Sequence, residues 1–165
     1  MRYLVLVLLP VVSLFLETSF FVQYPIWKSG PDLILLFVAF YALLNGSRRG
    51  CLYGFVCGLF RDLYVGRVIG LNALSLALTA YLLGKWELKV FQDNYLVGLF
   101  CAVAATAVNS MCLSILLFIS TGEFNAARTV GIQFVGQVIY NGILSIPFYI
   151  WYYKTSRQNW SKVSF

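Results

Sequence analysis

The residues best able to do chemistry in this sequence are a few glycines, acids and amides set inside long apolar runs. The stretch GCLYGFVCGLFRDLYVG, residues 50–66, places Gly50, Gly54 and Gly58 four residues apart, and Asp62 continues this register. A four-residue step keeps positions on one slowly winding face of a helix. Glycine on such a face lets another backbone approach closely. The pattern predicts a helix-packing or partner-binding groove, and a ligand-lined cavity is a third interpretation.

Asp62 is expected at the outer end of this groove. A carboxylate in hydrocarbon is costly, so it should lie at the membrane interface, meet a cation or cap a helix. Arg61 points about 100° away on a helix, so the two neighbours need not pair. We expect Asp62 to accept backbone N–H bonds near Gly66 and Gly70 and so to join the third and fourth helices. A substrate or proton site is the second interpretation.

A second polar set also lies within apolar runs, where ionisable side chains are candidates for function. Glu17 is near the outer end of the first run, either at the membrane interface or beside a cation. The outer-side cations that could reach it are Lys28, Arg61 and Arg128. The amides of this set are Asn109 in the fifth run and, at four-residue steps in the sixth, Gln133, Gln137 and Asn141. We expect them to hydrogen-bond between helices or to line a polar cavity.

The residue types needed for catalysis and metal binding are sparse. The chain has 4 cysteines and 0 histidines, and the cysteines lie in apolar runs without CxxC spacing. Such cysteines are expected to be small apolar residues rather than metal ligands or disulfides. The sequence also has no nucleophile beside a base and no phosphate-binding loop. It therefore predicts no enzyme, no metal site and no other cofactor.

The composition indicates a membrane protein. Hydrophobic residues make up 61% of the 165 residues, charged residues make up 11%, and the mean hydropathy is +0.82. A soluble domain has about a quarter of its residues charged, so membrane lipid is the expected surrounding. The net charge of +6 forms no basic face on a soluble element. It is better explained by membrane orientation than by nucleic acid, which we do not expect as a partner.

The apolar runs predict one all-α domain, residues 1–165, with six transmembrane helices. Their expected bounds are 3–23, 32–45, 50–65, 70–86, 94–119 and 130–153. The second and third runs are shorter than the roughly 20 residues that span hydrocarbon. They are expected to be tilted, buried among other helices, or in a locally thinned bilayer. The first run resembles a signal peptide at its start but lacks a small-residue cleavage site, so it is expected to be a retained span.

The charge distribution predicts the orientation. With the N-terminus inside and six spans, 8 of the 12 Lys and Arg residues are cytoplasmic, among them Arg48, Arg49 and Lys85. Both termini are therefore expected in the cytoplasm. A five-span arrangement with a re-entrant third run is the alternative. In either case, Pro31 and Asp32 suit the first turn of the second helix, where a carboxylate faces the positive end of the helix dipole.

Residues 31–84 resemble the core of the rod-shape-determining membrane protein family MreD. The matching residues begin with Pro31 and Asp32 opening an apolar helix, followed by Gly50, Gly54, Phe55, Gly58 and Asp62. They continue with GLNAL at 70–74 and end with Tyr81 and Gly84. Arg61 departs from the family pattern, in which an apolar residue usually precedes the aspartate.

The resemblance implies a non-catalytic scaffold of the cell-elongation machinery in a bacterial inner membrane. Such a protein would bind MreC, which has one span and a periplasmic coiled-coil region, and link it to peptidoglycan synthesis and cell-shape control. The wider assembly would include MreB filaments, a RodA-type glycosyltransferase and a class B penicillin-binding protein. The fold of the family has been likened to the substrate-binding subunits of energy-coupling-factor transporters. That likeness supplies the alternative function, a small-molecule-binding membrane subunit of a transporter.

Overall fold

The computed structural model describes residues 2–19, 30–65, 69–85, 95–122 and 124–160. Within these residues the chain is all α-helical, and each expected apolar run coincides with one helix. The helices are α1 (Arg2–Ser19), α2 (Leu33–Asn45), α3 (Ser47–Val65), α4 (Leu71–Lys85), α5 (Tyr95–Thr121) and α6 (Phe124–Trp160). The expectation of an all-α fold is confirmed.

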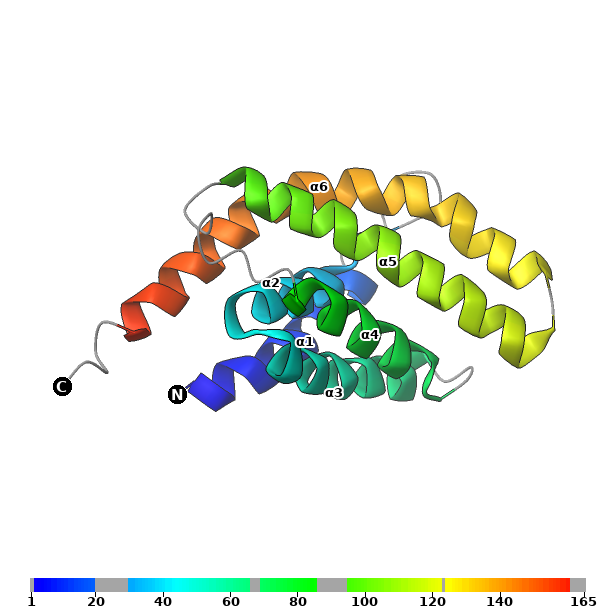
Figure 1. Ribbon diagram of the computed structural model, residues 1–165, viewed down its shortest axis with the longest axis horizontal. Coiled ribbons are helices and arrows are strands. Elements are labelled where there is room, and N and C mark those ends of the chain that lie inside the picture. The colour runs from blue at the N-terminus through cyan, green and yellow to red at the C-terminus, as the bar shows by residue number, and fades with distance from the viewer. Residues whose placement is uncertain (1, 20–29, 66–68, 86–94, 123, 161–165) are drawn as a thin grey trace.

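The helices form two antiparallel pairs around a central helix (Figure 1). Helices α3 and α4 pack along each other, as do the longer α5 and α6. Helix α2 contacts each of the other five helices. In the view of Figure 1 the α5–α6 hairpin extends past the other helices at the end where α5 and α6 are joined.

Helix α2 is the core of the molecule. Its sequence, LILLFVAFYALLN, is apolar all round, which is typical of a helix buried on every side. Residues 33–40 are all buried, and two edge-to-face ring contacts join α2 to α6, Phe37 with Phe148 and Phe40 with Tyr149. Of the arrangements expected for the short second run, the structure shows burial among other helices. A helix placed in this way need not be as long as the hydrocarbon layer is thick.

Two connections between helices are shorter than the gaps between the expected runs. The expected gap between residues 119 and 130 is mostly helical, because α5 continues to Thr121 and α6 begins at Phe124. Gly122, with φ 66°, allows this tight turn. Similarly α3 begins at Ser47, directly after Gly46 with φ 86°. Hydropathy marks where a helix is apolar and not where its hydrogen bonding ends, so the expected runs leave out the polar first turns of α3 and α6.

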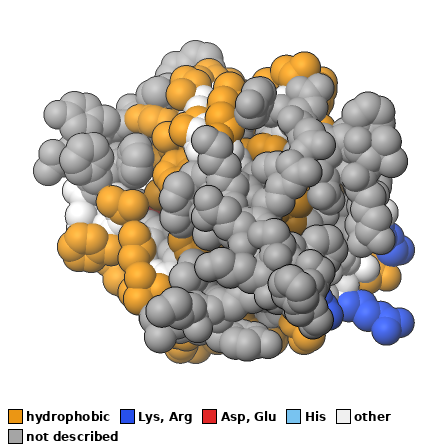
Figure 2. Space-filling view, turned by 90° about the vertical axis from the view of Figure 1, so that its left-hand side faces the viewer, with side chains coloured by type: hydrophobic (Ala, Val, Ile, Leu, Met, Phe, Trp, Pro, Cys, Tyr) orange, Lys and Arg blue, Asp and Glu red, His pale blue; other side chains and the backbone are white. Residues whose placement is uncertain are grey.

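Two described helices contain segments long and apolar enough to cross a membrane by themselves. These segments are Leu96–Thr121 in α5 and Thr129–Ile150 in α6, while Leu8–Ser19 and Leu33–Asn45 are shorter apolar helices. Large apolar side chains are also exposed, for example Leu52 at 70% and Ile119 at 74%. On the face shown in Figure 2, most described side chains at the surface are hydrophobic, and basic side chains lie at one edge. Such a surface is suited to lipid or to partner helices.

Candidate functional site

The most prominent polar feature is the N-terminal end of α2, where two carboxylates bind the first backbone amides. Asp32 is the N-cap residue, one position before the helix, and its Oδ1 accepts the Leu35 N–H at 3.0 Å. Glu17, from α1, accepts the N–H groups of Leu33 and Ile34 at 2.6 and 3.2 Å. These three amides have no partner within the helix, and the positive end of its dipole favours negative charge. Glu17 thereby joins α1 to α2.

Arg61 of α3 reaches the same end of α2. Its Nη1 lies 2.6 Å from Asp32 Oδ2, and the two side chains are 19% and 1% exposed. Arg61 and Glu17 therefore meet at the same end of α2, Arg61 through Asp32 and Glu17 through the first backbone amides. Lys28 and the Arg128 side chain, the other expected cations, lie outside what the structure describes. Arg61 therefore has a defined partner at the N-cap of α2.

Two polar residues of the α5–α6 hairpin complete this cluster. The Asp32 backbone N–H donates to Asn141 Oδ1 at 2.9 Å, and Asn141 Nδ2 donates to Thr106 Oγ1 at 3.0 Å. Thr106 in turn donates to the Ala102 carbonyl at 2.7 Å. Asn141 and Thr106 are fully buried. We call Glu17, Asp32, Arg61, Thr106 and Asn141 the α2 polar cluster, and it joins five helices.

Asp62 makes a separate set of bonds to the start of α4. Its Oδ2 accepts the backbone N–H groups of Gly70 and Ala73 at 2.9 and 3.0 Å. Its Oδ1 accepts the backbone N–H of Asn72 at 3.1 Å and the side-chain Nδ2 of the same residue at 2.7 Å. Asp62 as a whole residue is 2% exposed. Asp62 thus joins α3 to α4 as expected, through Gly70; Gly66 lies outside the described residues.

The glycine groove of α3 is filled by helices of the same chain. A Cβ added at Gly50 would lie 2.5 Å from Ala42 Cβ of α2, and one at Gly54 would lie 2.7 Å from the Leu76 carbonyl oxygen of α4. A Cβ at Gly58 would overlap the backbone at Ala73. Real Cβ contacts are longer than this. The groove is a packing surface inside the bundle, and no partner backbone can occupy it while α2 and α4 are in place.

The other predicted polar residues divide into two groups. Asn109 is buried, and its side-chain and backbone oxygens accept the Ser75 hydroxyl at 2.5 and 3.1 Å, which joins α5 to α4. Gln133 and Gln137 are partly exposed on α6, two turns and one turn before Asn141, and are not part of the α2 polar cluster. The structure therefore brings together Glu17, Asp32 and Asn141, and it keeps Asn109 and Asp62 at separate contacts.

Four of these contacts were not predicted from the sequence. Two of them are the cap that Glu17 provides for α2 and the ion pair of Arg61 with Asp32. The other two are the bonds of the Thr106 hydroxyl with Asn141 and of the Ser75 hydroxyl with Asn109. One signal was present, since the expected topology placed Glu17, Asp32 and Arg61 at the same outer ends. Thr106 and Ser75 had no such signal, because a hydroxyl in an apolar helix can bond its own backbone.

The arrangement holds helices together with internally satisfied polar groups. Every buried side-chain nitrogen or oxygen among the described residues has a hydrogen-bond partner. All four cysteines are free thiols, and no group of three His, Cys, Asp or Glu residues in the described part could hold a metal ion. Buried polar groups that are fully satisfied favour one rigid arrangement.

Comparison with known proteins gives one match. Residues 1–158 match the family described as rod shape-determining protein MreD. No curated protein and no solved structure matches the chain.

Proposed function

Because the chain belongs to the MreD family of rod shape-determining proteins, we propose that it is a non-catalytic membrane scaffold that binds MreC. The family gives the chain a role in rod-shape determination and makes it a membrane protein. In the proposed arrangement it spans a bacterial inner membrane six times, with both termini in the cytoplasm. By binding MreC it would link MreB filaments to peptidoglycan synthesis by a RodA-type glycosyltransferase and a class B penicillin-binding protein.

The observation that carries the scaffold proposal is the α2 polar cluster. The members of this cluster come from five different segments, and each is bonded inside the bundle to another member or to the first backbone amides of α2. Groups that are tied up in this way position helices rather than bind a changing ligand. The result is a rigid body whose outer surfaces are apolar, which suits a protein that holds another membrane helix in place.

The exposed side of α3 is the surface we assign to the MreC helix. Because the glycine side is closed, a partner must contact residues that the bundle leaves outside. An apolar stripe along α3 has this property, at Leu52, Val56, Phe60 and Leu63, with exposed fractions of 70, 47, 43 and 68%. The apolar part of α3 is short because charged residues lie near both ends of the helix. A helix shorter than the hydrocarbon thickness can be accommodated by association with another helix.

Co-purification from membranes in mild detergent tests this proposal. We expect MreC to be recovered with the unaltered chain and to be largely lost from the triple variant L52A/V56A/L63A. The matched control is M111A/I115A/I119A, which removes similar exposed apolar area from α5. Recovery of MreC with both variants would reject the α3 surface, and its absence from the unaltered chain would reject the scaffold.

The transporter alternative is decided by the same experiment. It requires an open polar chamber between α5 and α6, whereas Asn109 and Asn141 bond to Ser75 and Thr106 inside the bundle. Recovery of paired ATPases with a coupling membrane subunit would favour that alternative. The likeness to energy-coupling-factor subunits remains a prediction of fold.

A further inference from the structure

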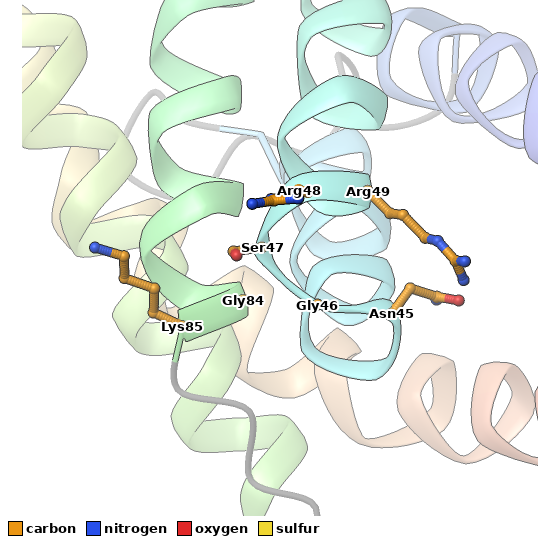
Figure 3. A pocket seen from close by; sticks show the side chains of 7 residues that line it. All are labelled: Asn45, Gly46, Ser47, Arg48, Arg49, Gly84 and Lys85. Atoms are coloured by element: carbon orange, nitrogen blue, oxygen red, sulfur yellow. The ribbon is translucent and has the colours of Figure 1, made fainter.

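A basic depression lies at the opposite end of α2 from the polar cluster. It has a volume of about 430 Å³ and lies where α2 ends, α3 begins and α4 ends (Figure 3). Its lining residues are Asn45, Gly46, Ser47, Arg48, Arg49, Gly84 and Lys85. Three of these carry positive charge and none is acidic. The depression therefore has an uncompensated positive lining among the described residues.

Close backbone packing brings together the two segments that carry the three cations. Gly84 of α4 lies against the start of α3, so that a Cβ there would be 2.5 Å from Ser47 Cα. This contact places Lys85 beside the first turn of α3, which carries Arg48 and Arg49. Figure 3 shows the Arg48 side chain directed towards α4 and that of Arg49 directed to the other side of α3. The Lys85 side chain is directed to the side of α4 away from α3, so Arg48 is the one cation of the three that points between the two helices (Figure 3).

The position of the depression indicates the depth at which it lies in the membrane. Buried apolar residues of α2 continue to Leu43, and those of α4 continue to Leu83. The depression follows directly after both, at the end of the apolar layer, where lipid head groups are found. The positive-inside rule predicts that this end faces the cytoplasm. Arg48, Arg49 and Lys85 are exposed there.

We propose that this depression binds the phosphate of an anionic phospholipid head group. Basic pockets between membrane helices on the cytoplasmic side bind such head groups, and arginine can give a phosphate two parallel hydrogen bonds. The acyl chains of the lipid would lie along the apolar surface of α4, where Leu78 and Leu82 are exposed at 47 and 46%. This inference goes beyond the proposed function, because it concerns the lipid and not MreC.

Native mass spectrometry of the full chain in mild detergent tests the proposal. The probes are phosphatidylglycerol and phosphatidylcholine with identical acyl chains. We expect preferential retention of phosphatidylglycerol and, for R48Q/R49Q, a loss of its affinity on the order of tenfold. The variant R48K/R49K, which keeps both charges, should retain most of the preference. Phosphatidylcholine binding should be unchanged in both.

Three results would overturn the proposal. One is equal retention of the two lipids by the unaltered chain. Another is an equal loss of phosphatidylglycerol affinity in K154Q/R157Q. This variant removes the same amount of charge from α6, so an equal loss would show that only the net charge of the protein matters. The third is displacement by inorganic phosphate at the same concentration as the lipid, which would make the ligand a soluble phosphate. Thermal unfolding of each variant shows whether it is folded, and K85Q offers a second test if R48Q/R49Q is not.

Discussion

Arg61 and Asp32 form an ion pair across the bundle, with Nη1 2.6 Å from Oδ2, although 29 positions separate them in the chain. The residue after Arg61 is bound elsewhere, since Asp62 accepts four hydrogen bonds from the start of α4. The two adjacent side chains therefore connect the end of α3 to two different helices, α2 and α4. This end of the bundle is held by charges that have little access to water.

Replacing Arg61 by methionine should destabilise the protein strongly. Asp32 is 1% exposed, and removing one partner of a buried pair costs about 3–5 kcal/mol because the other charge is left uncompensated. The double variant D32N/R61M should lose less than the sum of the two single variants. Thermal unfolding in detergent, analysed as a double-mutant cycle, measures this coupling. Strictly additive losses would show that the pair contributes no mutual stabilisation.

Asp62→Asn should impair the protein less than Asp62→Leu. Both carboxylate oxygens of Asp62 accept two hydrogen bonds each, and asparagine keeps one acceptor oxygen whereas leucine keeps none. Leaving a buried donor unsatisfied costs about 1–3 kcal/mol. Rescue of rod shape in cells lacking their own MreD, together with unfolding temperature, provides the measurement. Equal and severe loss in both variants would instead indicate that the negative charge itself is required.

Gly58→Ala should be far more damaging than Gly131→Ala. A Cβ at Gly58 would overlap the backbone of α4 at Ala73, whereas a Cβ at Gly131 would meet nothing within 4 Å. Alanine also favours a helix over glycine by about 1 kcal/mol, so Gly131→Ala should be neutral or stabilising. The measurement is the unfolding temperature of each variant in the same detergent, so that the same substitution is compared at the two positions. Similar values would mean that α3 and α4 are not packed as closely as described.

Much of the fold could be predicted from the sequence because hydrophobic runs and glycine spacing report local properties. The six apolar runs coincide with the six helices of the described residues. The four-residue spacing of Gly50, Gly54 and Gly58 predicted a close helix contact, and these glycines are in close contact with α2 and α4. Their spacing could not show which helices would occupy that face, since any backbone fits beside glycine.

The α2 polar cluster was harder to predict because its contacts join distant parts of the chain. Asn141 lies 109 positions from Asp32, and no local pattern specifies such a pair. Glu17 was expected either at the membrane interface or beside a cation, since the sequence gives the depth of an acid better than its partner. Its partners are backbone amides at the start of α2. Every helix start has such free amides, so the sequence does not show which helix an acid will cap.

Glu17→Gln should be tolerated much better than Glu17→Leu, and better than Asp62→Asn. Glu17 uses one oxygen, Oε1, for both of its bonds to Leu33 and Ile34, and glutamine retains one such oxygen. Asp62 uses both of its oxygens, so its amide variant must place an NH₂ group against backbone donors. Glu17→Leu leaves two α2 amides without an acceptor, at about 1–3 kcal/mol each. The unfolding temperature of E17Q should therefore be higher than that of D62N and much higher than that of E17L. If the unfolding temperature of E17Q is as low as that of E17L, the negative charge of Glu17 matters more than its hydrogen bonds.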